Sequence, residues 1–284
     1  MKIKFTKMHG IGNDYVYVDG FQETINNPNA FSKFISDRHF GIGSDGLVII
    51  LPSDKADFRM RMFNADGSEG RMCGNATRCI GKYVYEAGYT QKKNISLETL
   101  SGIKYLTLTV ENELVTSVEV DMGKALLSPK DIPISSPLNQ FINEPLDIDD
   151  TTYYVTGVSM GNPHAVLFSS EIDHLDLEKL GPKFEYHPLF PERINTEFVQ
   201  IINDTTLKMR VWERGSGETW ACGTGACATA VAAVLNGYCK PDSEITLQLR
   251  GGELKITYKT DGIVLMKGPA TKVFEGIIAY EEAN

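Results

Sequence analysis

The sequence predicts an α/β (α+β) fold of two pseudo-symmetric domains that arose by internal duplication, each with strands around a central, buried helix. Three observations lead to this fold class. The length of 284 residues lies near the size at which one hydrophobic core stops growing. The chain matches itself when it is shifted by 149 positions, and each copy contains one unusually apolar helical segment.

The internal match is densest between residues 60–74 and 209–223. Five of these 15 positions are identical, where average composition gives about one. The same shift aligns identical residues outside this segment: Gly12-Asn13 with Gly161-Asn162, Gly88 with Gly237, and Gly102 with Gly251. The register holds over about ninety residues, which indicates two copies of one structural unit.

The first copy begins with the turn at Gly12-Asn13, because glycine and asparagine favour tight turns before a strand. After the Cys-Gly pair at 73–74, Gly88 is the stop signal of a helix. The elements expected in order are a strand at 15–18, a helix at 29–38, strands at 47–51 and 58–63, and a helix at 75–87.

The second copy repeats this order with a strand at 165–168, a weaker helix at 176–180, strands at 197–202 and 207–212, and a helix at 225–236. The last helix contains no charged residue, so we expect it to be buried on most sides and wrapped by strands. Alternating apolar residues predict those strands, at 104–110, 115–120, 245–249 and 254–258.

A proline-rich stretch at 128–145 marks the boundary between the copies. The predicted first domain comprises residues 1–124 plus 270–284, because residues 270–280 are expected to return to it as a strand. The second domain comprises residues 125–269, and the active site is expected in the cleft between the domains.

Composition excludes several classes of protein. The net charge is −9 and no cluster of Lys and Arg interrupts the acidity, which argues against nucleic-acid or membrane partners. The longest apolar run, at 47–51, is far shorter than a membrane span, and the first residues contain no apolar signal-peptide core. The expected location is therefore cytoplasmic.

Two of the five cysteines stand at equivalent positions, Cys73 and Cys222, immediately before the two apolar helices. A helix N-terminus binds anions and stabilises a thiolate. Two copies facing each other would present one thiol to each side of a bound molecule, which is the geometry that inverts a stereocentre. The odd total favours reduced thiols, and packing roles are expected for Cys79, Cys227 and Cys239.

Four motifs resemble those of the diaminopimelate epimerase family: KMHGIGND at 7–14, FNADGSEGRMCGNATRC at 63–79, GNPH at 161–164 and ERGSGETWACGTG at 213–225. The resemblance runs through nearly the whole chain. It implies two similar domains, each a mixed β-sheet wrapped around a central helix. It also implies cofactor-independent epimerisation of LL-diaminopimelate to meso-diaminopimelate, in the biosynthesis of lysine and peptidoglycan precursors.

The resemblance also implies roles for individual residues. Cys73 and Cys222 match the acid/base pair, while His164 and Glu213 match residues near the reacting centre. Glu213 would also hold the α-amino group. The matched ligands of the reacting carboxylate are Gly74, Asn75, Gly223 and Thr224. The matched ligands of the remaining substrate, chiefly its distal end, are Asn13, Asn64, Asn162, Asn195 and Arg214. Gly46 departs from members that carry Gln there and is left out of the site.

Other sites find little support. The histidines have no metal-ligand spacing and no CxxC or HExxH motif occurs, so no metal is expected. Residues 41–46 fit GxGxxG, but a helix is expected before them and a strand after them, the reverse of a dinucleotide site. No cofactor is therefore expected.

Three functions remain to be separated. The first is the epimerase, with diaminopimelate as its small-molecule partner. The second is a racemase of another amino acid on the same two-cysteine scaffold, and the third is a thiol redox sensor, which requires both thiols to cycle in function. Association of two chains into a homodimer is left open.

Overall fold

The computed structural model describes residues 1–281, which form two compact units. Unit 1 comprises Met1–Val120 together with the C-terminal segment from Gly268, and unit 2 comprises Asp121–Lys267. The proline-rich segment 128–145, where the sequence suggested a boundary, belongs to unit 2. Its apolar side chains Ile132, Ile134 and Phe141 are buried in the core of that unit.

Unit 1 is built on one mixed sheet. Its strands in spatial order are β18 (Thr271–Ala279), β1 (Lys2–Gly10), β2 (Asn13–Asp19), β3 (Gly46–Leu51), β4 (Phe58–Asn64), β6 (Asn94–Thr99), β7 (Gly102–Glu111) and β8 (Leu114–Lys124). The pairs β2–β3 and β4–β6 are parallel and the others are antiparallel. The short β5 (Glu69–Gly70) adds to β4. The C-terminal strand β18 thus pairs with β1, the first strand of the chain.

Unit 2 repeats this layout. Its strands in spatial order are β9 (Glu144–Ile148), β10 (Thr151–Ser159), β11 (Pro163–Phe168), β12 (Asn195–Asn203), β13 (Thr206–Glu213), β15 (Glu244–Leu249), β16 (Gly252–Tyr258) and β17 (Ile263–Gly268). The pairs β11–β12 and β13–β15 are parallel, and β14 (Gly217–Thr219) adds to β13. The pairing order is that of unit 1, which confirms the duplication.

The four helices show how closely the copies correspond. They are α1 (Pro28–Ser36), α2 (Gly74–Glu86), α3 (Leu177–Glu185) and α4 (Gly223–Leu235). The bounds of α3 and α4 lie 149 positions after those of α1 and α2. The strand register repeats too, because Leu47 pairs with Phe63 in unit 1 and Thr196 pairs with Trp212 in unit 2.

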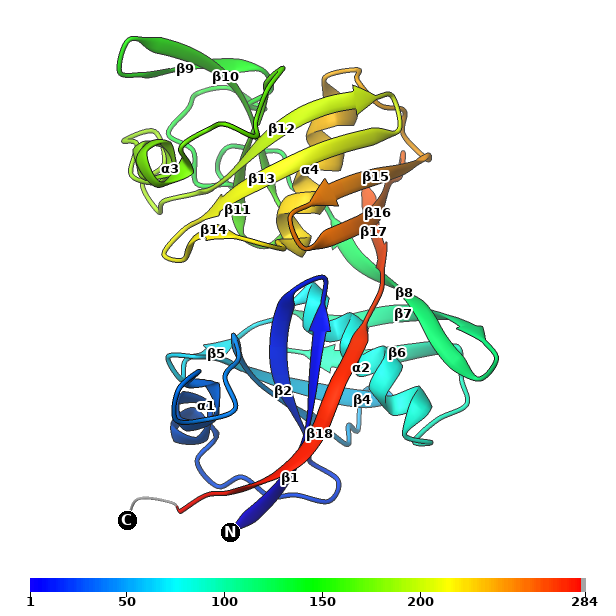
Figure 1. Cartoon of the computed structure of the whole chain (residues 1–284). Coiled ribbons are helices and arrows are strands. Elements are labelled where there is room, and N and C mark those ends of the chain that lie inside the picture. The colour runs from blue at the N-terminus through cyan, green and yellow to red at the C-terminus, as the bar shows by residue number, and fades with distance from the viewer. Residues whose placement is uncertain (282–284) are drawn as a thin grey trace. The chain divides into compact units, whose positions relative to one another are not determined.

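The central helix of each unit is surrounded by strands (Figure 1). Helix α4 contacts β10, β11, β12, β15 and β16, and its alanines are small enough for strands to pack closely on every side. Helix α2 contacts β1, β2 and β7. The predicted core helices are therefore confirmed.

Helix α3 is longer than the predicted helix at 176–180, and the prediction was wrong at its C-terminal end. Pro182 lies inside the helix, and proline ordinarily ends a helix because it lacks an N–H donor. Fully buried Phe184 packs edge-on against Phe198 and Tyr153. This packing holds the last turn in helical form despite the proline.

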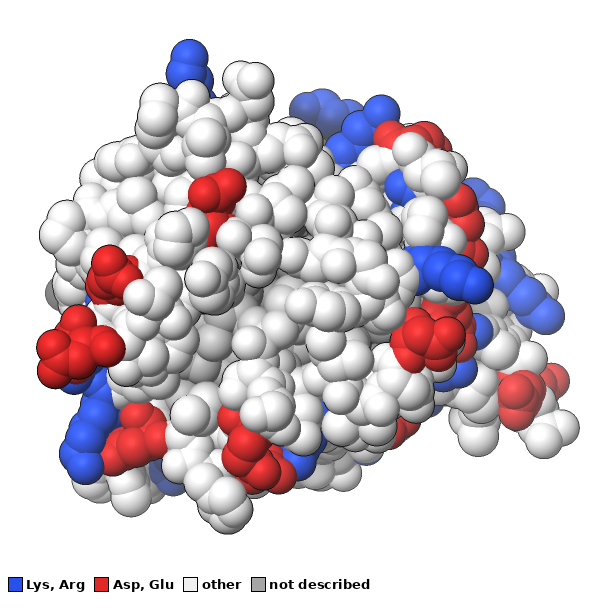
Figure 2. Space-filling model, turned by 90° about the horizontal axis from the view of Figure 1, so that it is seen from above, with Lys and Arg blue, Asp and Glu red and all other residues white. Residues whose placement is uncertain are grey.

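None of the helices within residues 1–281 is both long and apolar enough to cross a membrane. On the face of the molecule shown in Figure 2, Lys and Arg side chains are interspersed with Asp and Glu and do not gather into a broad basic area. This distribution agrees with the net charge of −9.

Candidate active site

Unit 1 places Cys73 immediately before its central helix. Cys73 is the N-cap of α2, with extended backbone (φ −133°). Its Sγ donates to Asn13 Oδ1 at 3.4 Å, and Asn75 Nδ2 donates to the same oxygen at 3.1 Å. Fully buried Arg78 in turn donates to Asn75 Oδ1 at 2.9 Å. The structure thus brings together the predicted residues Cys73, Asn13 and Asn75.

Tyr15 also lies beside Cys73, and sequence reasoning missed it. Its hydroxyl hydrogen-bonds the thiol, and burial followed by the charge of Cys73 raises the pKa of Tyr15 well above its ordinary value. Burial raises the pKa of Cys73, while the amides of Ala76 and Asn75 and the charge of Arg78 oppose that shift. The main charge acting on Cys73 is thus the cation of Arg78, while the carboxylate of Asp45 lies behind Asn13.

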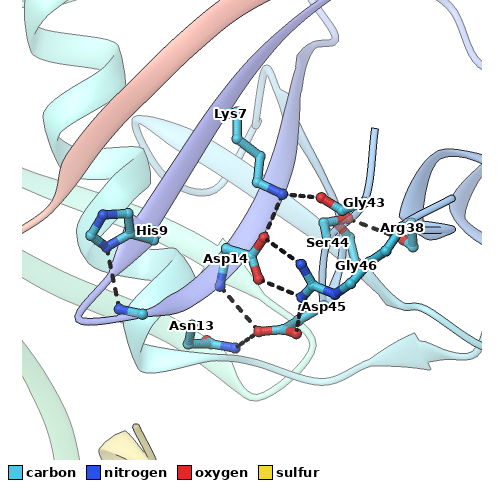
Figure 3. A network of polar contacts seen from close by, with 11 residues as sticks. Lys7, His9, Asn13, Asp14, Arg38, Gly43, Ser44, Asp45 and Gly46 are labelled. Carbon is cyan, nitrogen blue, oxygen red and sulfur yellow. Dashed lines mark hydrogen bonds and ion pairs between the residues drawn. The ribbon is translucent and has the colours of Figure 1, made fainter. Parts of the chain in front are cut away.

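A polar network fixes the amide of Asn13 (Figure 3). Asn13 Nδ2 donates to Asp45 Oδ2 at 2.8 Å, which leaves Oδ1 to face Cys73. Asp45 also pairs with Arg38 (Nη2 to Oδ1, 3.0 Å) and accepts from the backbone N–H of Asp14 at 3.1 Å. Asp45 was not among the predicted residues, because its closeness to Asn13 depends on how the loop before β3 folds back.

The same network contains a nearly buried ion pair. Lys7 pairs with Asp14 and donates to the carbonyl oxygen of Gly43, and Arg38 Nη2 lies 2.9 Å from Asp14 Oδ1. Burial raises the pKa of Asp14, but the hydrogen bonds of Arg38 and Lys7 outweigh it and lower the pKa below its usual value. Asp45 behaves oppositely, since burial and the negative charge of Asp14 raise its pKa.

Unit 2 places Cys222 at the equivalent position, the N-cap of α4. Its Sγ accepts from the N–H of Gly225 at 3.4 Å and lies 3.5 Å from Thr224 Oγ1. Burial raises the pKa of Cys222 well above its ordinary value, and the negative charges of Glu213 and Glu197 raise it further. The two predicted thiols therefore have equivalent backbone positions and different electrostatic surroundings.

Glu213 lies beside Cys222, as the resemblance implied. Its carboxylate hydrogen-bonds Cys222 and accepts from the hydroxyl of Thr219. Burial raises the pKa of Glu213, and these two hydrogen bonds oppose the shift. A carboxyl group held in this way is suited to proton exchange or to binding an ammonium group.

His164 and Asn162 complete the surroundings of Cys222. His164 Nε2 lies 3.1 Å from Asn162 Oδ1, and Asn162 Nδ2 donates to Thr224 Oγ1 at 3.2 Å. His164 Nδ1 lies 2.7 Å from an Oε1 of Glu197, and both residues are fully buried. Sequence reasoning missed Glu197, although an acid at an inward position of an apolar strand was a signal that could have found it.

Three predicted substrate ligands, Asn195, Arg214 and Asn64, hydrogen-bond to other groups of the protein. Asn195 is almost fully buried, donates to the carbonyl of Pro163 at 2.8 Å and accepts from the N–H of Arg214 at 3.0 Å. The guanidinium of Arg214 donates to the carbonyl of Glu192 at 2.9 Å. Exposed Asn64 donates to Ser68 Oγ at 2.9 Å. These contacts position the side chains; their roles toward a substrate stay predictions.

The structure explains the glycine at position 46 and places Trp220, two residues before Cys222, at the surface. A Cβ built on Gly46 would lie 2.0 Å from the carbonyl oxygen of Phe63 and 2.8 Å from the ring of Tyr15, so this backbone accepts only glycine. Trp220 is 61% exposed and therefore does not pack into the core. Cys79 and Cys227 are fully buried, as their predicted packing roles require, and all five cysteines are free.

The remaining motifs do not form a cofactor site. The GxGxxG segment lies after α1 and before β3, the reverse of the order in a dinucleotide site. Across residues 1–281, no group of three or more His, Cys, Asp or Glu side chains is placed to hold a metal ion.

Comparison with known proteins identifies close relatives. The family model described as diaminopimelate epimerase matches residues 5–127 and 156–273. A diaminopimelate epimerase of Acetivibrio thermocellus is 58% identical over 281 residues, covering 99% of this chain and 100% of the relative. The diaminopimelate epimerase of Methanococcus maripaludis is 57% identical over 277 residues, covering 97% of this chain and 99% of the relative. That of Bacillus cytotoxicus is 47% identical over 283 residues, covering 99% of this chain and 98% of the relative.

Solved structures share the fold at low identity. A phenazine biosynthesis protein of the PhzF family from Bacillus anthracis aligns with a TM-score of 0.73 at 17% identity, covering 99% of this chain and 100% of that chain. A hydroxyproline epimerase from Agrobacterium vitis, with bound trans-4-hydroxy-L-proline, aligns with a TM-score of 0.72 at 14% identity, covering 98% and 91%. At these identities the likeness establishes the fold class alone, and it agrees with the predicted one.

Proposed function

The chain belongs to the diaminopimelate epimerase family, and from this membership we propose that it interconverts LL- and meso-diaminopimelate without a cofactor. It is an isomerase. The observation that carries the proposal is the pair Cys73 and Cys222, one at the N-cap of each central helix, at equivalent positions of a duplicated unit.

The proposed reaction uses the two thiols in turn. One cysteine, as thiolate, takes the proton from the α-carbon, so the Cα–H bond breaks and an S–H bond forms. The electron pair left on carbon is delocalised into the carboxylate. The other cysteine then gives its proton to the opposite face of the carbon, which inverts its configuration. This proposal requires the substrate to bind between the two domains, taken as residues 1–124 plus 270–284 and residues 125–269.

The helix N-termini are the proposed binding site of the reacting carboxylate. Gly74 and Gly223 are the first residues of α2 and α4, so their N–H groups have no acceptor four residues earlier within the helix. Such N–H groups and the helix dipole bind anions, and they stabilise the charge that grows on the carboxylate as the carbanion forms. Asn75 and Thr224 add side-chain donors. Glu213, with its raised pKa, is the proposed partner of the α-amino group.

The distal end of the substrate distinguishes diaminopimelate from other amino acids. We assign it to the polar side chains carried over from the family: Asn13, Asn64, Asn162, Asn195 and Arg214. A guanidinium forks onto a carboxylate with two hydrogen bonds, which a shorter amino acid without a distal carboxylate does not form.

The test is proton exchange in D₂O. Pure, reduced protein incubated with LL-diaminopimelate should incorporate deuterium at the α-carbon and form the meso isomer. Cys73→Ala and Cys222→Ala should each lower that rate by roughly 10³-fold or more, because each removes one proton carrier. Exchange with another amino acid but not with diaminopimelate would point to a racemase. Absence of exchange with every amino acid would overturn the proposal.

We further place the reaction in the synthesis of lysine and peptidoglycan precursors, and the enzyme in the cytoplasm. The reason is chemical, since both thiols must stay reduced and the cytoplasm maintains that state. Activity measured in separated cell fractions tests the location. Recovery of most activity outside the cytoplasmic fraction would contradict it.

A further inference from the structure

Glu197 and His164 form a buried pair of unlike groups beside the Cys222 half of the site. They stand on neighbouring parallel strands, β12 and β11, and neither has any exposed side-chain surface. His164 Nδ1 lies 2.7 Å from Glu197 Oε1, while Glu197 Oε2 has no hydrogen-bond partner. Burying a carboxylate with one unsatisfied oxygen costs free energy, so its presence needs a reason.

Comparison of the two units shows that the fold itself does not require a carboxylate at this position. In unit 1 the positions equivalent to His164 and Glu197 are Tyr15 and Val48, on the corresponding strands β2 and β3, and both are buried. A valine therefore completes the same strand position without any charge. The carboxylate in unit 2 serves something that unit 1 does without.

The contacts of His164 lead from Glu197 to Cys222. On its other side, His164 Nε2 faces Asn162 Oδ1 at 3.1 Å, and Asn162 Nδ2 donates to Thr224 Oγ1 at 3.2 Å. Thr224 Oγ1 lies 3.5 Å from Cys222 Sγ. The chain of contacts thus runs through four side chains and ends at the sulfur.

The equivalent asparagine of unit 1 has the opposite orientation. Asn13 turns its Nδ2 to the carboxylate of Asp45 and its Oδ1 to Cys73. Asn162 instead turns its Oδ1 to His164 and its Nδ2 towards the residue beside Cys222. What stands behind each amide therefore determines which end faces its cysteine.

We propose that Glu197 is a positioning residue for the Cys222 half of the reaction. Its carboxylate accepts the Nδ1–H of His164 and fixes the ring, so that the Nε2–H donates to Asn162 Oδ1. Asn162 then presents its amino group to Thr224, which holds the hydroxyl next to Cys222. The kinetic part of this inference rests on the proposed function, whereas the state of the His164 ring does not.

Replacement by valine, the residue at the equivalent place in unit 1, is the direct test. Glu197→Val should preserve the fold and lower kcat for epimerisation roughly 10- to 100-fold, the usual cost of removing a carboxylate that orients a functional histidine. Glu197→Gln keeps an acceptor for Nδ1–H and should recover most of the loss. Exposed Glu253, whose Oε1 accepts from Gln248, supplies the control, and Glu253→Gln should leave kcat unchanged.

A double-mutant cycle separates positioning from general stability. If Glu197 acts through His164, adding Glu197→Val to His164→Gln should change kcat less than about twofold, because the pathway is already broken. Losses that multiply would overturn the proposal. Wild-type kcat in a folded Glu197→Val protein would overturn it as well.

A spectroscopic readout does not require the substrate. Nitrogen-15 NMR of the imidazoles, assigned by comparison with His164→Gln, should show a strongly hydrogen-bonded proton on Nδ1 of His164 that Glu197→Val removes. An unchanged His164 signal in Glu197→Val would overturn the proposal. If wild-type protein fails to act on diaminopimelate while the NMR result holds, the proposed function fails and the positioning role stands.

Discussion

Cys73 and Cys222 begin equivalent helices, but their neighbours differ in charge. Around Cys73 the main charge effect comes from the cation of buried Arg78, and the carboxylate of Asp45 stands behind Asn13. Around Cys222 stand two carboxylates, Glu213 and Glu197, which raise its pKa further than burial does alone. The duplication has kept the backbone of the two half-sites, whereas their electrostatics have diverged.

Four paired positions account for the groups that differ directly around the two thiols. Where unit 1 has Tyr15, Val48, Asn64 and Ala76, unit 2 has His164, Glu197, Glu213 and Gly225. Each pair occupies the same place in strand or helix, so the exchange of side chains required no change of fold. A two-base reaction gains from this difference, because it needs one thiolate and one thiol at the same time.

The largest expected effect concerns an ion pair that only unit 1 possesses, since Pro163 stands at the place of Asp14 in unit 2. Asp14→Ala removes the charge partner of Lys7, whose side chain is 8% exposed. Leaving that ammonium buried and unpaired should lower the free energy of unfolding by about 3 kcal/mol. Urea denaturation followed by circular dichroism measures the change.

The chain offers a way to assign this loss to one unit. Both tryptophans, Trp212 and Trp220, belong to unit 2, so their fluorescence reports unit 2 while circular dichroism reports both. Asp14→Ala should shift the dichroism transition more than the fluorescence transition. Equal shifts would show that the two units unfold together, so that the loss of the ion pair could not be assigned to unit 1 alone.

The lowered pKa of Asp14 also gives this prediction a pH dependence. A carboxyl group with a lowered folded pKa stabilises the protein above its unfolded pKa of about 3.9, and this contribution is lost as the pH falls through the lower folded value. The difference between wild type and Asp14→Ala should therefore be constant near neutral pH and shrink in acid. A constant difference down to pH 2 would contradict the assignment.

The next effect tests the geometry of the Cys222 half. A Cβ at Gly225 would lie 2.6 Å from Glu197 Oε1 and 3.2 Å from Cys222 Sγ, whereas Ala76 carries a Cβ at the same place in unit 1. Gly225→Ala should displace one of these groups and lower kcat by about 100-fold, the usual cost of a misplacement near 1 Å. Steady-state kinetics with LL-diaminopimelate measures this loss.

A compensating substitution sharpens the Gly225 prediction. Adding Glu197→Val to Gly225→Ala recreates the packing of unit 1 and should restore thermal stability without restoring kcat. Full activity of Gly225→Ala alone would show that the close approach of Gly225 to Glu197 is irrelevant to the reaction.

The smallest expected effect is the order in which the thiols ionise. Burial raises both pKa values, but the carboxylates raise that of Cys222 further, while helix-start amides and Arg78 oppose the shift at Cys73. As the pH rises, iodoacetamide should therefore modify Cys73 before Cys222 in the free enzyme, since only the thiolate reacts. Peptide mass spectrometry follows each site. Glu213→Gln should reduce the pKa difference between Cys222 and Cys73. Modification of Cys222 before Cys73 would contradict the predicted order of ionisation.

Most of the fold could be predicted from the sequence, because the internal repeat is preserved at the residues where helices and strands begin and end. Gly88 and Gly237 end the two central helices, and the cysteines begin them. The end of α3 was missed because Pro182 is a local signal against a helix, whereas the packing of Phe184 that overrides it is a contact between distant segments.

The sequence predicted the two cysteines of the candidate site but not all of the residues that surround them. Cys73 and Cys222 are marked by the repeat itself. Tyr15 and Glu197 lie within strand patterns that are apolar for the most part, and their closeness to the thiols follows from strand pairing. Whether two segments some thirty residues apart pair with each other is not visible in either segment alone. Tyr15 therefore emerges only once the sheet is assembled, whereas Glu197 could have been singled out as an acid within an apolar strand.

The strand β18 places both ends of the chain in unit 1, where the amino group of Met1 donates to the carbonyl of Tyr280 at 2.6 Å. Unit 2 is thus an insertion whose last residue, Lys267, leaves the ribosome before β18 does. Because domains fold as units while they emerge, unit 2 is able to complete its sheet first, whereas the sheet of unit 1 is complete only after β18 has been made. Unit 1 begins before unit 2 along the chain but is completed after it.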